Sequence, residues 1–257
     1  YNTFRKKAEN TMSDYDIRSQ HLNFDGLLNS RELGGMPLQN GGTFREKIAI
    51  RSDSPSGLTK EQCAKIVSYG VNLVIDLRSP GEVRHYGNPF KDIPEVRFYN
   101  IPLIMGDPDQ ASDPTIVFLR THKLGDFYVL ILQKLGDRIC NVLRLISDNT
   151  SGITMYHCAH GKDRTGVISA FLYLLAGASR EDIIRNYECS YEFMRPILDP
   201  AVEAIEPGLK HILNSDRENM IILLDYIDSV YGGDVTKYLL ENGMTKDEID
   251  KLRSRLI

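Results

Sequence analysis

The chain has 257 residues, of which 42% are hydrophobic and 26% are charged, proportions that are ordinary for a globular domain with a buried core. Its formal net charge of −4 excludes a general attraction to nucleic acid or to an acidic membrane, so any anion site must be local. No stretch approaches the roughly 18 apolar residues that a membrane-spanning helix needs. We therefore expect no nucleic-acid partner, no membrane span and a cytoplasmic location, with secretion left open if a leader was removed.

The cysteines lie far apart and form no CxxC pair; they are Cys63, Cys140, Cys158 and Cys189. Disulfide frameworks and zinc ribbons use closely spaced pairs, so the sequence predicts reduced thiols and no zinc ribbon. We expect no metal and no other cofactor. All except Cys158 fall in helical patterns and are predicted to be core residues.

Apolar periodicity and turn residues predict an alternation of strands and helices. A polar arm over 1–28 and a Gly-rich loop or hairpin over 29–42 come first. The elements predicted after them are a strand at 47–52, a helix at 56–70, strands at 71–77 and 96–102, a loop at 104–115, a helical region at 124–148 with a break near Gly136, a strand at 152–157, helices at 165–176, 180–193 and 216–231, and two short helices from 234 onward.

This order of elements predicts an α/β fold with a central, mostly parallel sheet flanked by helices. We expect one domain over 29–257, preceded by the arm. The helical regions 124–148 and 199–231 exceed what a minimal sheet needs, and they could form a lid or simply belong to the core. Parallel sheets bind ligands at the carboxyl ends of their strands. Two motifs follow such ends, DLRSPGE at 76–82 and MYHCAHGKDRTG at 155–166.

The second motif places Arg164 six positions after Cys158, a spacing that is typical of a loop that wraps one tetrahedral oxyanion. The N–H groups of 159–164 can all point inward as a nest. The helix that begins near Thr165 adds free N–H groups and the positive end of its dipole. Arg164 can bind two phosphate oxygens with its planar guanidinium. This positive environment favours the thiolate of Cys158, and a thiolate below a phosphorus atom is an in-line nucleophile.

We therefore predict that Cys158 is the nucleophile of a substrate-binding loop. The other residues of that loop are Ala159, His160, Gly161, Lys162, Asp163, Arg164 and Thr165. Gly161 and Gly166 let the chain turn and approach the ligand closely. Thr165 starts the helix, donates its hydroxyl to the thiolate, or does both. His157 is expected to orient the loop from behind.

HCAHGKDRTG matches the HCxxGxxR(S/T)G signature of cysteine-dependent protein-tyrosine phosphatases, and its GKDRTG form resembles an atypical bacterial branch of tyrosine, dual-specificity and phosphoinositide phosphatases. NSRELGG at 29–35 and the segments at 48–59 and 70–83 resemble the same branch in the same order. The resemblance spans about 29 to 177 and departs from the usual pattern at Ser30 and Glu32. It implies a phosphatase-like fold, a cysteinyl-phosphate intermediate without metal, phosphorylated protein or phosphoinositide substrates, and inorganic phosphate as the product.

Two residues of the loop keep more than one interpretation. Lys162 is a second cation at the rim: either a solvated loop charge, or a contact to substrate phosphate that would favour multiply phosphorylated ligands such as phosphoinositides. Asp163 is a general acid, a base for the hydrolytic water, or a carboxylate that stabilises the loop.

A leaving alkoxide or phenoxide needs a proton, so a general acid is expected near the loop. The stretch after the strand at 96–102 contains three candidates, Asp107, Asp109 and Asp113. Asp107 lies closest to the strand end and is the predicted acid. The other interpretation is that this stretch is an ordinary acidic surface loop. Asp76, at the end of the strand 71–77, lies at the rim or makes a structural hydrogen bond.

Three functions suit a loop of this kind. A phosphomonoester hydrolase that acts on phosphotyrosine and phosphoinositides is the main prediction. A rhodanese-type sulfurtransferase also uses a loop cysteine, but its loop is typically shorter and lacks the C-x5-R-T pairing. A phospho-ligand binding module would be expected to lose Cys158 or Arg164, and both are present.

Overall fold

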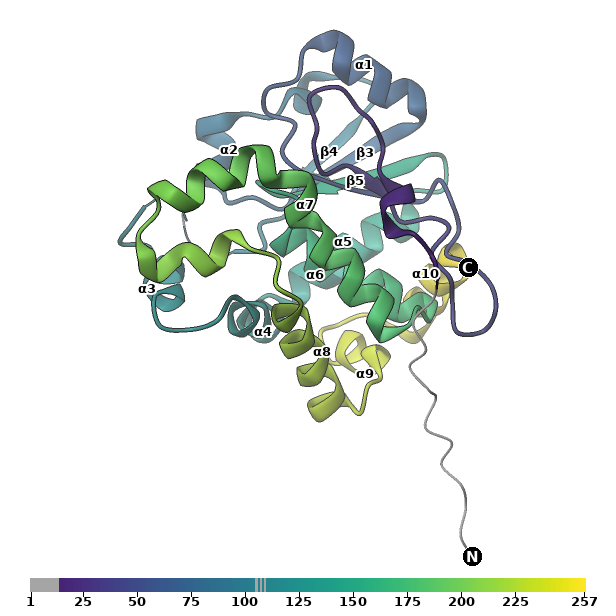
Figure 1. Cartoon of the computed structure of the whole chain (residues 1–257). Helices are drawn as coiled ribbons and strands as arrows, with labels where there is room; N and C mark the ends of the chain where they lie inside the picture. The colour runs from purple at the N-terminus through teal and green to yellow at the C-terminus, as the bar shows by residue number, and fades with distance from the viewer. Residues whose placement is uncertain (1–13, 105, 107, 109) are drawn as a thin grey trace, which may run out of the picture.

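The computed structural model describes residues 14–104, 106, 108 and 110–257 and contains one central sheet (Figure 1). The strand order in the described residues is β1-β2-β5-β3-β4. The strands are β1 (Arg31–Glu32), β2 (Ala49–Ser52), β3 (Val71–Asp76), β4 (Arg97–Asn100) and β5 (Ile153–His157). β2, β5, β3 and β4 run parallel, and β1 is antiparallel at one edge. The predicted α/β fold with a mostly parallel sheet is therefore confirmed.

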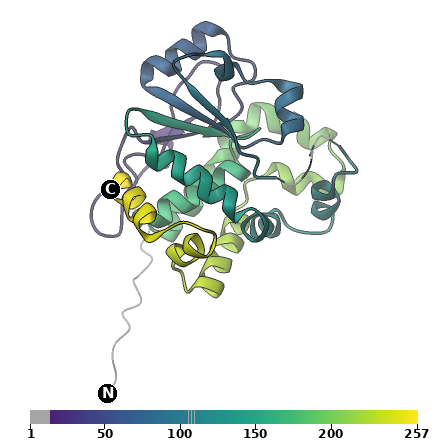
Figure 2. The ribbon, with the colours of Figure 1, turned by 180° about the vertical axis from the view of Figure 1, so that it is seen from behind.

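Helices cover both faces of the sheet. They are α1 (Lys60–Tyr69), α2 (Pro80–Tyr86), α3 (Pro114–Leu119), α4 (Leu124–Lys134), α5 (Gly136–Asp148), α6 (Asp163–Ala176), α7 (Arg180–Ala204), α8 (Arg217–Tyr231), α9 (Val235–Glu241) and α10 (Lys246–Leu256), with short 3₁₀ helices η1 (Ile17–Gln20), η2 (Pro89–Asp92) and η3 (Pro207–Leu213). Figure 1 shows α1 on one face and α5 and α6 on the other, and the view from behind in Figure 2 agrees.

Alternation along the strands divides the core into two layers, because successive side chains of a strand point to opposite faces. Ile75 and Tyr156 pack in the large cluster with α4 to α6 and the C-terminal helices. Val74 and Met155 pack in the smaller cluster with Cys63 of α1. The central strands β3 and β5 are almost completely buried, so polar residues at their ends are held on a rigid support.

Local capping chemistry explains where the helices before the site begin. α1 starts at a capping box between Thr59 and Gln62 and stops at Gly70, whose φ is 119°, so it lies within the helix predicted at 56–70. α2 starts at a second capping box, between Ser79 and Glu82. The sequence analysis did not predict α2, a helix of 7 residues; its capping box follows the strand end directly.

α7 is longer than predicted, because it continues from 193 to Ala204 through Pro196 and Pro200. Prolines inside a helix remove backbone donors. Here an apolar cluster of Met194, Leu198 and Leu213 holds the second half of α7 against η3. This cluster is separate from the two layers that cover the sheet.

Figure 1 shows α7 changing direction partway along its length. At that point the Ser215 hydroxyl accepts a hydrogen bond from the Tyr191 N–H at 2.8 Å and donates one to the Glu188 carbonyl at 2.7 Å. A side chain inserted into the backbone ladder is a common cause of a helix bend. Ser215 therefore anchors the segment after η3 to the middle of α7.

Within the described part of the predicted arm, Ile17 and Leu27 are buried in the two core layers. Among the described helices, none is both long enough and apolar enough to cross a bilayer.

Candidate active site

The motif loop lies at the carboxyl end of β5, between the ends of β2 and β3, where ligands of parallel sheets bind. β5 ends at His157, and α6 begins at Asp163. Between them, Cys158 is buried in the structure, with 1% of its surface exposed, and Arg164 is 8% exposed. The sheet and the first turn of α6 thus bring the predicted nucleophile and arginine together.

The carbonyl groups of the loop are bound from outside by donors on neighbouring segments. The Ala159 carbonyl accepts from the Ser54 N–H at 3.0 Å. The Asn29 amide donates to the carbonyls of His160 at 2.9 Å and Gly161 at 3.1 Å. Arg51 donates a further bond to the Gly161 carbonyl at 2.8 Å. Because N–H and C=O of a trans peptide point in opposite directions, these bonds turn the N–H groups that follow toward the inside of the loop.

A second group of contacts holds those donors in place. The Asp53 carboxylate accepts from the Asn29 N–H at 3.0 Å. Arg51 also donates to the Asn186 side chain at 2.5 Å, which ties the loop to α7. Arg51 is completely buried, so it donates its bonds in a site from which water is excluded.

Gly161 adopts a conformation that other residues avoid, because its φ is +63°. A Cβ atom at this position would lie 2.5 Å from backbone atoms of Ser52 and Asp53. The loop therefore passes so close to the end of β2 that no side chain fits.

Replacing Gly161 with Ala should displace the loop from β2 and lower kcat/KM for a phosphate monoester by about a hundredfold or more, the scale of a lost oxyanion donor. Gly57→Ala is the matched control, because nothing lies within 4 Å of a Cβ built there. Steady-state kinetics on both variants give the test. Wild-type turnover by Gly161→Ala would contradict the described approach of the loop to β2.

The guanidinium of Arg164 is held by Glu82. Its two terminal nitrogens donate to the carboxylate at 2.6 and 2.9 Å. Burial works against the charged form of Glu82, but the bonds from Arg164 outweigh it and lower the pKa of Glu82. Burial likewise opposes the charge of Arg164, and the neighbouring Cys158 and Glu82 raise its pKa. An arginine has five N–H donors, so this contact leaves three of them for an anion.

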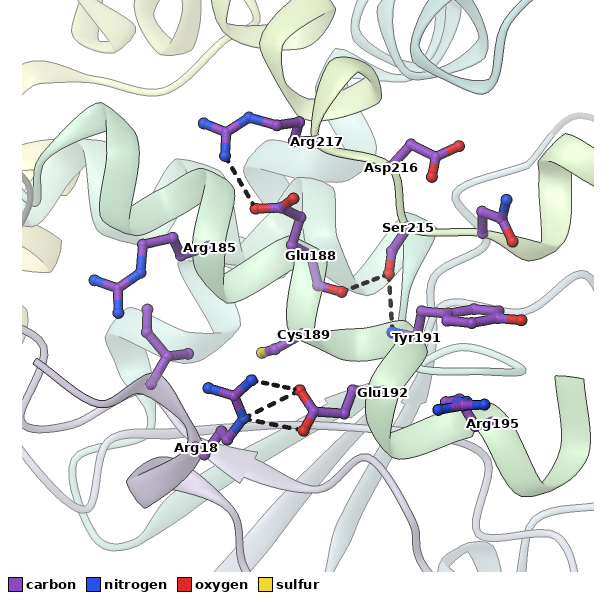
Figure 3. A pocket seen from close by; sticks show the side chains of 12 residues that line it. Arg18, Arg185, Glu188, Cys189, Tyr191, Glu192, Arg195, Ser215, Asp216 and Arg217 are labelled. Atoms are coloured by element: carbon purple, nitrogen blue, oxygen red, sulfur yellow. Dashed lines mark hydrogen bonds and ion pairs between the residues drawn. The ribbon is translucent and has the colours of Figure 1, made fainter. Parts of the chain in front are cut away.

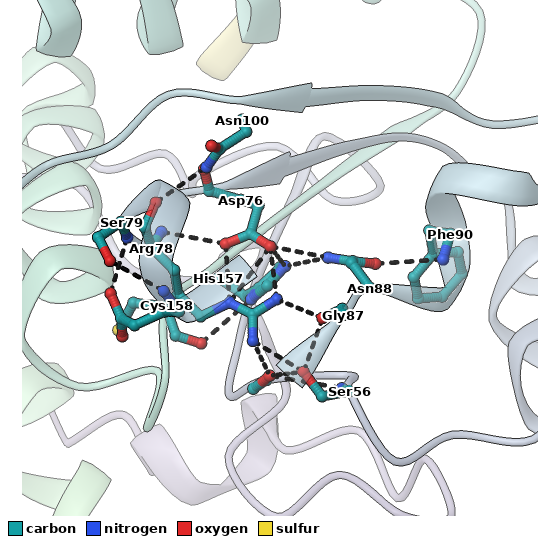
Figure 4. A network of polar contacts seen from close by, with 12 residues as sticks. Ser56, Asp76, Arg78, Ser79, Gly87, Asn88, Phe90, Asn100, His157 and Cys158 are labelled. Atoms are coloured by element: carbon teal, nitrogen blue, oxygen red, sulfur yellow. Dashed lines mark hydrogen bonds and ion pairs between the residues drawn. The ribbon is translucent and has the colours of Figure 1, made fainter. Parts of the chain in front are cut away.

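A buried polar network fixes the loop from the other side (Figure 4). His157 bonds to the Cys158 carbonyl at 3.1 Å through Nδ1 and to the Asn88 amide at 2.9 Å through Nε2. Burial lowers the pKa of His157, so the neutral ring donates from Nδ1 and accepts at Nε2. His157 therefore lies behind the loop, where the sequence analysis expected it.

Asp76 is the buried centre of this network. It accepts a bidentate contact from Arg78, at 3.0 and 2.7 Å, and a bond from Asn88 at 3.0 Å. Burial alone would raise the pKa of Asp76, but the hydrogen bonds and charge of Arg78, with the bond from Asn88, lower it to about 2. Of the two roles expected for Asp76, the structure assigns the structural one.

Replacing Asp76 with Asn should destabilise the fold by about 3–5 kcal/mol, because Arg78 would remain buried without its carboxylate. The ordinary pKa of 3.8 lies above the folded value of about 2. The stabilisation by Asp76 is therefore present above about pH 4 and is lost as the pH falls toward 2. Urea unfolding at pH 7 and between pH 5 and 2.5 should show that the variant lacks this acid-dependent loss.

The matched control is Asp148→Asn. Asp148 is 61% exposed and pairs with Lys251 at the surface, so its loss should cost less than about 1 kcal/mol. A similarly small effect of Asp76→Asn would contradict the role of the buried network.

The prediction that Lys162 lies at the rim is wrong, because its side chain is completely buried. Its ammonium donates to the Asp163 carboxylate at 2.9 Å and to the carbonyls of Ile212 at 2.8 Å and Asn214 at 2.7 Å. The sequence could not show this direction, since two of the three partners are backbone groups of a segment about fifty residues away.

Asp163 lies in the first turn of α6 and is 20% exposed. Besides Lys162, the Tyr128 hydroxyl donates to its carboxylate at 2.5 Å. Asp107, the predicted acid, and Asp109 lie outside the described residues. Asp113 is buried and accepts from the Thr115 N–H at 2.8 Å, as the N-terminal cap of α3.

The other predicted residues also belong to the loop. Ala159 and Gly161 contribute backbone groups to it. Burial, together with the charge of Lys162, lowers the pKa of His160 to about 4, so this ring is neutral near pH 7. Thr165 lies in the first turn of α6. Its hydroxyl is buried and has no hydrogen-bond partner among the described residues, which leaves it available to the thiolate or to a bound anion.

Sequence reasoning missed the residues that support the loop from a distance, namely Asn29, Arg51 and Glu82. All three stand in the segments that resemble the phosphatase branch, but those segments gave no role to individual side chains. The signal for Glu82 was the capping-box spacing from Ser79. Nothing local identifies Asn29 or Arg51, because their bonds to the loop depend on the sheet.

A separate cavity of about 870 Å³ lies between η1, the bend of α7 and residues 214–217 (Figure 3). Residues 158–164 do not line it. Its arginines face carboxylates: Arg18 pairs with Glu192 at 2.9 Å, and Arg217 pairs with Glu188 at 3.4 Å. We therefore assign the candidate active site to the loop and not to this cavity.

The loop has the features of an anion site with the predicted nucleophile at its base: carbonyl groups bound on the outside, a helix start, an oriented arginine and a buried thiol. In the part of the chain that the structure describes, no three His, Cys, Asp or Glu side chains group in a way that could hold a metal ion. The geometry defines a cradle for a tetrahedral oxyanion such as phosphate.

Comparison with known proteins agrees with a loop that binds a phosphate group. Residues 22–257 match the model of the tyrosine phosphatase family, and the chain belongs to that family. A protein from Cupriavidus necator, named provisionally as a tyrosine-protein phosphatase, is 26% identical over 66% of this chain and 63% of its own length. A tyrosine-protein phosphatase from Nostoc commune is 26% identical over 80% of this chain and 73% of its own length. The chain thus spans less than two thirds of the length of the first of these bacterial relatives.

Proposed function

We propose that this chain hydrolyses phosphate monoesters of tyrosine through a cysteinyl-phosphate intermediate. The observation that carries the proposal is the loop above Cys158, in which outward-bound carbonyls and the Arg164–Glu82 pair prepare a cradle for one phosphoryl group. Such donors stabilise charge on the equatorial oxygens of the transition state without reorganising during the reaction.

In the first step the Cys158 thiolate forms a bond to phosphorus, and the bond between phosphorus and the tyrosine oxygen breaks. The leaving phenoxide takes a proton from a general acid. In the second step a water molecule gives a proton to the same group, now a base, and attacks the phosphorus. Inorganic phosphate leaves, and the thiolate is regenerated.

We assign the proton transfers to Asp163. Its carboxylate lies next to Arg164 in the chain, is partly exposed and is fixed by bonds from Tyr128 and Lys162. Asp107 remains the alternative from the sequence. A comparison of Asp163→Asn with Asp107→Asn separates the two. A general acid must be protonated to act, so only the variant that lacks it should lose the part of the kcat–pH profile that depends on its protonation.

Phosphotyrosine is the substrate class that the family and the names of both relatives favour. Hydrolysis of phosphoinositides stays a prediction from the resemblance, since Lys162, the residue that motivated it, is turned away from the rim. The sulfurtransferase and the phospho-ligand module gain no support from the site.

Cys158→Ser should abolish hydrolysis of a phosphotyrosine peptide while binding of the peptide persists, because the hydroxyl is a far weaker nucleophile in a loop whose donors are unchanged. Turnover and calorimetric binding measure the two properties. Cys63→Ser, on the other face of the sheet, is the control and should retain turnover. Hydrolysis at the wild-type rate by Cys158→Ser would end the proposal.

Arg164→Lys keeps the charge but loses the planar pair of donors, so kcat should fall by roughly two powers of ten or more. The control is Arg144→Lys, which alters an arginine that pairs with Glu248 at 2.8 Å and is 30% exposed. Steady-state kinetics on the same peptide give the comparison. If both variants turned over nearly as fast as the wild type, Arg164 would have no special role in binding phosphate.

A further inference from the structure

The Lys162 side chain has no donor left for a substrate. An ammonium group has three N–H donors, and Lys162 uses them on the Asp163 carboxylate, the Ile212 carbonyl and the Asn214 carbonyl, at 2.9, 2.8 and 2.7 Å. The side chain is completely buried. A buried charge that leaves such partners loses both its counter-charge and its hydrogen bonds, so a swing toward a substrate phosphate would be costly.

The contact with Asp163 is part of a fixed constellation. Lys162 and the Tyr128 hydroxyl both donate to Oδ1 of the carboxylate, at 2.9 and 2.5 Å. Tyr128 is itself held by the Tyr187 hydroxyl at 2.7 Å. Two donors from different elements therefore restrict Asp163 to one orientation, and they occupy one of its oxygens while the other is left for proton transfer.

The other two bonds of Lys162 reach Ile212, near the end of η3, and Asn214, directly after η3. The residue that follows, Ser215, is bonded to the backbone of α7 at two points, as Figure 3 shows. The carbonyls of Ile212 and Asn214 thus belong to a segment anchored on α7, and together with Asp163 they hold the ammonium in place. The lysine joins this segment to the first turn of α6.

We propose that Lys162 is a positioning residue that holds Asp163 in the orientation for proton transfer, and that it does not bind the substrate phosphate. The inference rests on the proposed function, since it takes Asp163 as the group that protonates the leaving oxygen. It reverses the sequence-based interpretation, in which Lys162 selects multiply phosphorylated ligands.

The test uses two substrates that differ in their need for an acid. Phenyl phosphate has a poor leaving group, and p-nitrophenyl phosphate has a good one that leaves without a proton. Lys162→Met should lower kcat/KM on phenyl phosphate, which reports the step that forms the cysteinyl-phosphate, by about tenfold or more, a part of what general acid catalysis supplies. The loss on p-nitrophenyl phosphate should be much smaller, and KM should change little on both substrates.

The double variant with Asp163→Asn sharpens the assignment. Residues that act as a unit are not additive, so Lys162→Met should cost little further once Asp163 is Asn. Lys251→Met is the matched control: Lys251 is 56% exposed and pairs with Asp148 at the surface, so this variant should show no dependence on the leaving group. If Lys162→Met does not fold, Lys162→Arg tests the same point, because a planar guanidinium cannot reproduce three bonds in these directions.

Three results would overturn the inference. Equal losses on both substrates, additive with Asp163→Asn, would make Lys162 a support of the loop only. A raised KM, largest for an inositol polyphosphate, would make it a substrate ligand. An unchanged kcat/KM for both Lys162 variants would remove any role. Failure of the proposed function itself is distinct, since hydrolysis would then persist in Cys158→Ser whatever Lys162 does.

Discussion

The candidate site depends on one constraint: the carbonyl groups of the loop after β5 are bound on the outside, so its N–H groups must face inward. Three such carbonyls, those of Ala159, His160 and Gly161, find donors far away in the sequence, namely Ser54, Asn29 and Arg51. The carbonyl of Cys158 is bound by the preceding residue, His157. In a loop free to relax, the carbonyls would compete for the centre and repel an anion. The surrounding fold therefore prepares the anion site before any ligand arrives, which is what electrostatic catalysis requires.

Charge balance explains how so many ionised groups share a small buried volume. Arg164 faces Glu82, Arg78 faces Asp76, and Lys162 faces Asp163, each at 2.9 Å or less. Pairs of this kind contribute little net stability, but the loss of one member is costly. Their role here is orientation, since each pair fixes one side chain around the loop. The site keeps its shape because moving one of these charges away from its partner would cost free energy.

The local part of this site could be predicted from the sequence, and the long-range part could not. Cys158, Gly161 and Arg164 follow from spacing within one turn, because a strand, a tight loop and a helix start dictate where they lie. Asn29 and Arg51 reach the loop because β1 pairs with β2 and β2 pairs with β5 in the observed register. No local sequence pattern reveals that pairing. Lys162 was misplaced for the same reason, since its carbonyl partners at 212 and 214 carry no sequence signal. The length of α7 was underestimated because the cost of its prolines is offset by tertiary packing.

The most direct measurement of the central claim is an amide NMR titration of the wild-type chain with inorganic phosphate, the product of the proposed reaction. If the N–H groups of the loop face inward and bind the oxyanion, the amides of 159–164 should show the largest downfield shifts, and they should saturate together. Cys158→Ser should show the same pattern, because it leaves the donors in place. Shifts confined to other regions, such as the arginines around the cavity at α7, or no saturable shift in the loop, would contradict the account.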